Sequence, residues 1–91
     1  MANFKIGDAV LVRGKSKNYE AYVVEFDRYG QVGTICVHMS WDGDGVYVDV
    51  PPSELTKIKL QDLSPIMLRE ATDLRWKEYL KAAQAKEAEG T

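Results

Sequence analysis

The sequence has a single cysteine, a small net charge and only short apolar runs, and each of these absences argues against a class of protein. Cys36 is the only cysteine among the 91 residues, which excludes a disulfide within the chain. Twelve basic and 14 acidic side chains give a formal net charge of -2, so no overall positive field attracts nucleic acid. No apolar run approaches the roughly 20 residues of a membrane span, and we expect no contact with a membrane.

Signals for catalysis and for targeting are also lacking. There is no G-x-S-x-G, no phosphate-binding P-loop and no G-x-G-x-x-G. His38 is the only histidine and lacks a cysteine partner, which favours a structural or pocket-lining role over metal binding or catalysis. We therefore expect no enzymatic activity, no cofactor and no metal. The N-terminus has no signal-peptide pattern, so an intracellular location is expected.

Short strand-like segments separated by turn residues make up residues 4–59. The five segments predicted as strands are 9–13, 20–27, 31–39, 45–50 and 54–59. Pro51-Pro52 ends the fourth segment, and Cys36 lies in the apolar run of the third, where we expect it to be buried. This spacing predicts a mainly β domain over residues 1–60, a five-stranded SH3-like antiparallel barrel.

The second of these segments is apolar on both faces. Alternation places Tyr19, Ala21 and Val23 on one face and Tyr22, Val24 and Phe26 on the other. The same alternation groups Ile35, Val37 and Met39 in the third segment, and Val46, Val48 and Val50 in the fourth. A barrel this small holds only one face inside, so another element must cover part of the outside.

That covering element is a helix predicted over residues 65–88, within a C-terminal segment of residues 61–91. Ser64 suits the N-cap and Pro65 the first helical position. Met67, Ala71 and Leu74 form an apolar stripe that we expect to pack on the barrel.

A second stripe, formed by Trp76, Leu80 and Ala83, lies nearly opposite the first on the same helix. It faces solvent or a partner, unless the helix curves and carries Trp76 onto the rim of the barrel. Beyond Ala83 the only apolar residues are alanines, so we expect this end to fray.

The stretch Asp42-Gly43-Asp44-Gly45 has the first two spacings of a calcium-binding loop. Val46 stands where the third oxygen ligand is expected, and no glutamate follows six residues later. An Asp-Gly turn between valine-rich strands is typical of a hairpin, and we favour that interpretation.

Aromatic residues next to loops indicate a ligand-binding site. Tyr19, Trp41 and Tyr47 flank loops, and loops that join successive antiparallel strands alternate between the two ends of a barrel. Tyr19 and Trp41 are therefore expected at one end, with Tyr47 as a third ring. Aromatic faces attract cations such as methylated ammonium groups, and Asp42 and Asp44 would add negative charge at the rim.

Four segments, FKIGDAVLV, NYEAYVVEF, VHMSWDG and VDVPPSELTKI, resemble the chromo barrel and Tudor-like domains, especially the chromo barrels of MRG-type chromatin proteins. The resemblance implies that the chain binds methyl-lysine peptides in the nucleus. It places Tyr19 and Trp41 in an aromatic cage, Met39 where the family has a tyrosine, and Tyr47 near a missing second tryptophan.

Three functions are therefore expected as alternatives. The first is a module that binds a protein or peptide, including a methyl-lysine peptide, through Tyr19, Met39, Trp41, Tyr47, Asp42 and Asp44. The second is a small barrel that binds nucleic acid through local basic residues, namely Lys5, Arg13, Lys15, Lys17, Lys57 and Lys59. The third is an assembly or inhibitor protein whose Trp76, Leu80 and Ala83 dock a partner, which includes a homodimer formed through the helix.

Overall fold

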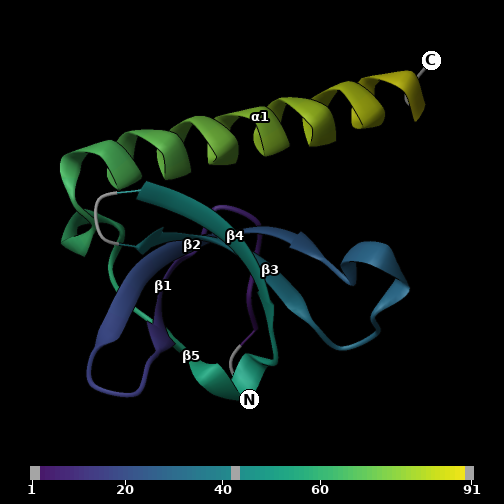
Figure 1. Cartoon of the computed structure of the whole chain (residues 1–91). Coiled ribbons are helices and arrows are strands. Elements are labelled where there is room, and N and C mark those ends of the chain that lie inside the picture. The colour runs from purple at the N-terminus through teal and green to yellow at the C-terminus, as the bar shows by residue number, and fades with distance from the viewer. Residues whose placement is uncertain (1–2, 42–43, 90–91) are drawn as a thin grey trace.

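A computed structural model describes residues 3–41 and 44–89 as one antiparallel sheet and a C-terminal helix (Figure 1). The strands run in the order β4-β3-β2-β1-β5 across the sheet. Their bounds are β1 Ala9–Arg13, β2 Asn18–Phe26, β3 Ile35–Trp41, β4 Asp44–Val50 and β5 Leu55–Lys57. The helix α1 spans Pro65–Glu89. The predicted class, mainly β with a C-terminal helix, is confirmed.

The predicted strand segments match these strands with one clear error. The third segment was expected from Gln31, but β3 begins at Ile35. A hydrogen-bonded turn occupies the intervening residues, with the Thr34 amide donating to the Gln31 carbonyl oxygen and the Gly33 amide donating to the Asp27 carboxylate. Gly33 has a φ of 86°, a conformation that favours glycine and ends the extended backbone there.

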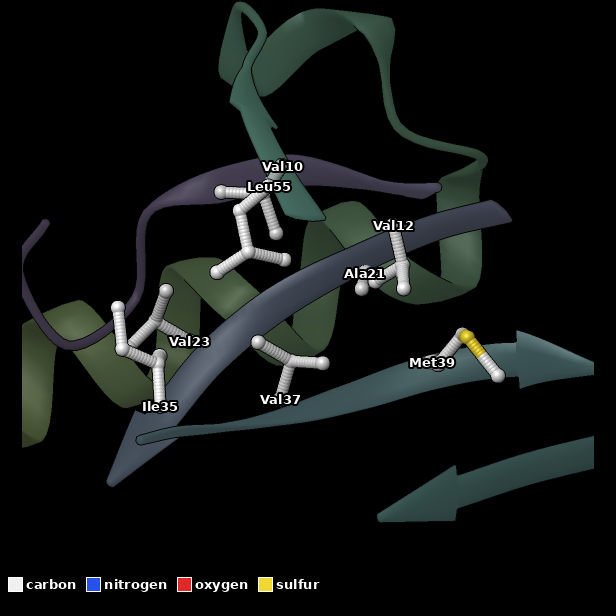
Figure 2. Close-up of a cluster of buried hydrophobic side chains, with 8 residues drawn as sticks. All are labelled: Val10, Val12, Ala21, Val23, Ile35, Val37, Met39 and Leu55. Carbon is white, nitrogen blue, oxygen red and sulfur yellow. The ribbon is translucent and has the colours of Figure 1, made fainter. Parts of the chain in front are cut away.

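One face of the sheet forms the inner core. Alternating residues of four strands point to this face and fill it: Val10, Val12, Ala21, Val23, Ile35, Val37, Met39 and Leu55 (Figure 2). These side chains are between 0 and 8% exposed, which follows from the period of two in the sequence. Val46, Val48 and Val50 of β4, at the edge opposite β5, also pack against this core.

A β-bulge in β2 changes the face of one aromatic residue. The register with β3 shifts between Val23 and Glu25, so that Phe26 pairs with Ile35. Paired residues of an antiparallel ladder share a face, so Phe26 lies on the inner-core side of the sheet. The prediction that Phe26 shares a face with Tyr22 is wrong, because strict alternation does not account for the extra residue.

The outer face of the sheet is covered by the first half of α1, as predicted. Met67 and Ala71 are buried against Ala9 and Tyr22, and Leu63 completes this second cluster. Val24, Ile58, Leu60, Leu68 and Leu74 pack around it. We refer to residues 65–75 as the proximal half of α1. Burial of its apolar stripe explains why the helix lies across the sheet (Figure 1).

Arg75 fixes the point at which α1 leaves the sheet. Its Nε donates to the Gly7 carbonyl oxygen at 3.1 Å, and its guanidinium lies 3.3 Å from the Asp8 carboxylate. Gly7 has a φ of 91°, and a Cβ at this position would overlap the Arg75 side chain. A glycine is therefore required for the close approach of β1 and the helix.

Beyond Arg75 the helix projects from the strands (Figure 1). We refer to residues 76–86 as the distal half of α1. Trp76 and Tyr79 are 60% and 62% exposed, and Leu80 is 39% exposed, so the second stripe does not fold back onto the sheet. The alternative in which Trp76 reaches the barrel rim is wrong. Within residues 3–41 and 44–89, no helix has the length and apolar character needed to cross a bilayer.

Candidate functional site

Tyr19 of β2 and Trp41 of β3 meet at one end of the sheet, which we call the aromatic end. Their ring centroids are 5.0 Å apart and the ring planes differ by 24°. Trp41 is 47% exposed and Tyr19 is half-buried. The expectation that these two rings share one end of the sheet is confirmed.

The two rings stack directly and do not form an open cage. A cation held between two aromatic faces needs roughly 7 Å between them, because each face makes contact at about 3.5–4 Å. A centroid distance of 5.0 Å leaves no such space. The Lys17 ammonium also lies over the Tyr19 ring, 5.1 Å from its centroid, so a cation of the chain itself already contacts a face of this ring.

Two other residues expected at this site lie elsewhere. Met39 is 6% exposed and belongs to the inner core, so it is not available to a ligand. Tyr47 pairs with His38 in the β3–β4 ladder, and its ring packs on the imidazole at 4.7 Å, on the outer face of the sheet. Because of this geometry, the prediction that Met39 and Tyr47 share a binding site with Trp41 is wrong. The period of two puts Tyr47 on the opposite face from Trp41, whereas Met39 shares the face of Trp41 and is excluded by its burial.

Two aspartates, Asp42 and Asp44, were expected beside the aromatic rings. Asp44 is exposed and pairs with Trp41 in the ladder, so it lies close to the aromatic end. Asp42 lies outside the described residues. In the parts of the chain that the structure describes, no group of three or more histidine, cysteine, aspartate or glutamate side chains could hold a metal ion.

A polar network on the outer face joins the sheet to α1. Tyr22 Oη donates to Glu70 Oε2 at 3.1 Å, and His38 Nδ1 lies 3.0 Å from the same hydroxyl. With the hydroxyl donating to Glu70, the tautomer of His38 that is protonated at Nδ1 would donate to Tyr22 Oη. His38 Nδ1 also lies 3.6 Å from Glu70 Oε2. We refer to Tyr22, His38 and Glu70 as the outer-face network.

The chemistry of this network is that of a structural bridge. Burial, followed by the charge of Glu70, raises the pKa of Tyr22 above its ordinary value, so the phenol stays protonated. Clefts of about 340 and 220 Å³ adjoin the network and share Glu70. Tyr22 Oη, His38 Nδ1 and Glu70 Oε2 are all partnered within the chain, so we assign the network to holding the proximal half of α1 on the sheet.

Gly45 of β4 makes room for the imidazole. A Cβ at this position would overlap Nε2 and Cε1 of His38. The sequence favoured a structural or pocket-lining role for His38 but did not identify the partners that its imidazole has in the outer-face network. Glu70 follows Met67 by three residues and therefore lies near the stripe that faces the sheet, which is the signal that could have indicated it.

The only cysteine is buried, and its thiol is not a candidate nucleophile. Cys36 is 1% exposed, and burial raises the pKa of its thiol. The expectation that Cys36 is a small buried residue is confirmed.

Near Cys36, the Arg28 guanidinium makes two hydrogen bonds to the Asp49 carboxylate, 3.2 Å from Nε and 2.9 Å from the terminal nitrogen. The hydrogen bond to Asp49 raises the pKa of Arg28.

The basic residues placed by the strand register lie in two groups, towards opposite ends of β1. Arg13, Lys15 and Lys17 belong to the β1–β2 hairpin at the aromatic end. Lys57 pairs with Val10, towards the other end of β1, where its ammonium lies 3.4 Å from Asp8. A continuous track for a phosphate backbone would need these two groups on one face.

The distal half of α1 presents an exposed surface of aromatic and aliphatic side chains. The rings of Trp76 and Tyr79 stack on each other at 5.4 Å, and Leu80 continues the stripe. Ala83 is half-buried on the same stripe. Within residues 76–86 three lysines, Lys77, Lys81 and Lys86, stand against the single acid Glu78, so this surface combines apolar and positive character.

Comparisons of the chain with protein-family models, with curated proteins and with solved structures find no match.

Proposed function

We propose that this chain is a non-enzymatic module that binds a protein partner through the distal half of α1. The observation that supports this best is the exposure of Trp76, Tyr79 and Leu80 on a helix whose proximal half is buried against the sheet. Exposed aromatic and aliphatic groups that are contiguous typically mark interaction surfaces. Tryptophan and tyrosine are also the residues that contribute most to protein interfaces.

The chemistry of this surface indicates the kind of partner. An amphipathic helix binds by laying its apolar face into a groove of another protein, with anchor residues spaced three or four apart. Trp76, Tyr79, Leu80 and Ala83 have this spacing. Because Lys77, Lys81 and Lys86 lie along the same half, the groove that fits it is apolar with acidic residues at its rim.

Self-association through this helix is less favourable than binding to an acidic partner. Two copies of the distal half would bring the same basic side chains into proximity. The homodimer that the sequence predicted through Trp76, Leu80 and Ala83 is therefore not the arrangement that we propose.

The aromatic end is a second candidate for peptide binding. Trp41 is half exposed beside Tyr19, and Asp44 adds a carboxylate there. A methyl-lysine side chain could enter between the rings only if they separate from their present stack. For this reason we propose the distal half of α1, and not the aromatic end, as the main binding surface.

A peptide-display selection against the wild-type chain tests the proposal. We expect selected peptides to combine apolar and acidic residues. Their affinity should fall at least about 30-fold for the double variant Trp76→Glu/Leu80→Glu and stay unchanged for Trp41→Ala. Far-ultraviolet circular dichroism should show the same helix content in all three chains. Loss of binding with Trp41→Ala and retention with the double variant would instead identify the aromatic end as the site.

A further inference from the structure

The two edges of the sheet differ in how well they are protected against pairing with another strand. β5 has three residues, follows Pro51-Pro52 and carries Lys57. Brevity, proline and lysine are the usual means by which an edge strand avoids pairing with another chain. β4 has seven residues and contains neither proline nor lysine. Its free edge is therefore the one able to accept a further strand (Figure 1).

The inner core is also incompletely covered along β4. Val46, Val48 and Val50 point to the inner core but are only half-buried. Their ladder partners on β3, Met39, Val37 and Ile35, are between 0 and 6% exposed. Among the described residues, β4 pairs only with β3, so the outward backbone groups and these valines lack a neighbouring strand.

We propose that β4 of a second copy of this chain pairs antiparallel with β4 about a two-fold axis at Tyr47. In this register Val46 faces Val48 of the second copy, and Gly45 faces its Asp49. The two Tyr47 rings come together on the outer face, where each is 59% exposed. Cross-strand pairs of aromatic and of β-branched residues stabilise such ladders.

The sequence of β4 favours a copy of itself over an unrelated strand. The segment Gly45-Val46-Tyr47-Val48-Asp49 is nearly symmetric about Tyr47, so a two-fold axis repeats each favourable pair. No two carboxylates face each other in this register. Asp49 is in addition neutralised by Arg28, at 2.9 Å. The inference concerns a surface other than the distal half of α1 and does not depend on the proposed function.

Disulfide trapping tests the register directly. Directly opposed residues of an antiparallel pair have Cα atoms about 4.5–5.5 Å apart, within the roughly 4.4–6.8 Å range that a disulfide spans. We expect Tyr47→Cys to form a covalent dimer under mild oxidation, seen as a doubled mass without reductant. Thr56→Cys, at an exposed position of the protected edge β5, is the matched control and should give no more dimer than wild type. Equal trapping of both variants, or of neither, would overturn the proposal.

Sedimentation equilibrium tests the same pairing without a crosslink. We expect the wild-type chain to shift from monomer to dimer mass as concentration rises, and Tyr47→Lys to weaken this association at least about tenfold by placing two cations at the axis. The double variant Trp76→Glu/Leu80→Glu should associate like wild type. A chain that stays monomeric up to about 1 mM would overturn the inference. So would an association lost in the double variant but kept in Tyr47→Lys. Neither result bears on whether the distal half of α1 binds a different protein.

Discussion

The two halves of α1 belong to one continuous helix but have opposite relations to the rest of the chain. The proximal half buries Met67 and Ala71 against the sheet, whereas the distal half exposes Trp76, Tyr79 and Leu80. Helix propensity does not distinguish them, since residues with high helix propensity make up most of both halves. The difference shows that the proximal half stabilises the fold, and that the distal half carries large apolar groups which the fold does not use.

The largest expected effect comes from a charge placed under the proximal half. Ala71 is fully buried, so Ala71→Glu should lower the free energy of unfolding by about 4 kcal/mol, because an unpaired carboxylate is forced into the interface. Ala82→Glu, the same change at an exposed position beyond Arg75, should alter it by less than about 0.5 kcal/mol. Urea unfolding followed by circular dichroism measures both. Similar losses in the two variants would contradict the division of α1 into halves.

Truncation of a large apolar side chain should also lower stability far more in the proximal half than in the distal half. Met67→Ala should cost about 3 kcal/mol of stability, because it leaves a cavity between helix and sheet. Leu80→Ala removes a side chain that is 39% exposed and should cost less than about 1 kcal/mol. Urea midpoints at constant m-value give the comparison. A larger loss for Leu80→Ala would mean that the distal half also packs on the sheet.

The outer-face network should add a smaller contribution to the docking of the proximal half. Gly45→Ala should cost about 2 kcal/mol, because its Cβ would displace the His38 imidazole from Tyr22. If the overlap with His38 is the cause, the same substitution in a His38→Ala background should cost much less. Thermal or urea unfolding of the four chains in this double-mutant cycle gives the coupling energy. Additive losses would show that Gly45 is required for another reason.

The smallest expected effect is that of the Tyr22 hydroxyl. Tyr22→Phe should cost about 1 kcal/mol near neutral pH, where the bonds to Glu70 and His38 are lost. The pKa of Tyr22 is raised in the folded chain, so above about pH 10 the unfolded chain releases this proton first and stability falls as pH rises. Tyr22→Phe should therefore lose less stability than wild type between about pH 9 and pH 11. Equal slopes for the two chains would exclude this hydroxyl as a source of the alkaline dependence.

Much of the fold could be predicted because it depends on local patterns. Alternating valines indicated the inner face, Ser64-Pro65 indicated the start of α1, and the apolar faces of the second strand required a covering helix. The bulge that moves Phe26 could not be predicted, because it depends on the register between β2 and β3 and not on the composition of either strand.

The candidate site was harder to predict, because it depends on which faces meet in three dimensions. The placement of Tyr19 beside Trp41 followed from the connectivity of antiparallel strands. Met39 and Tyr47 were assigned to the same end through a resemblance of short motifs, although their own alternation placed one in the inner core and the other on the outer face. The bond from Tyr22 to Glu70 joins residues 48 positions apart, which no local pattern specifies.

The contacts of Arg75 have a consequence for how a partner would bind. Its bonds to Gly7 and Asp8 tie the helix to the turn that precedes β1, so the direction of the projecting turns is already set in the unbound chain. A partner that binds Trp76 therefore meets a helix whose direction is already set, so that orienting this helix adds little conformational entropy cost to association.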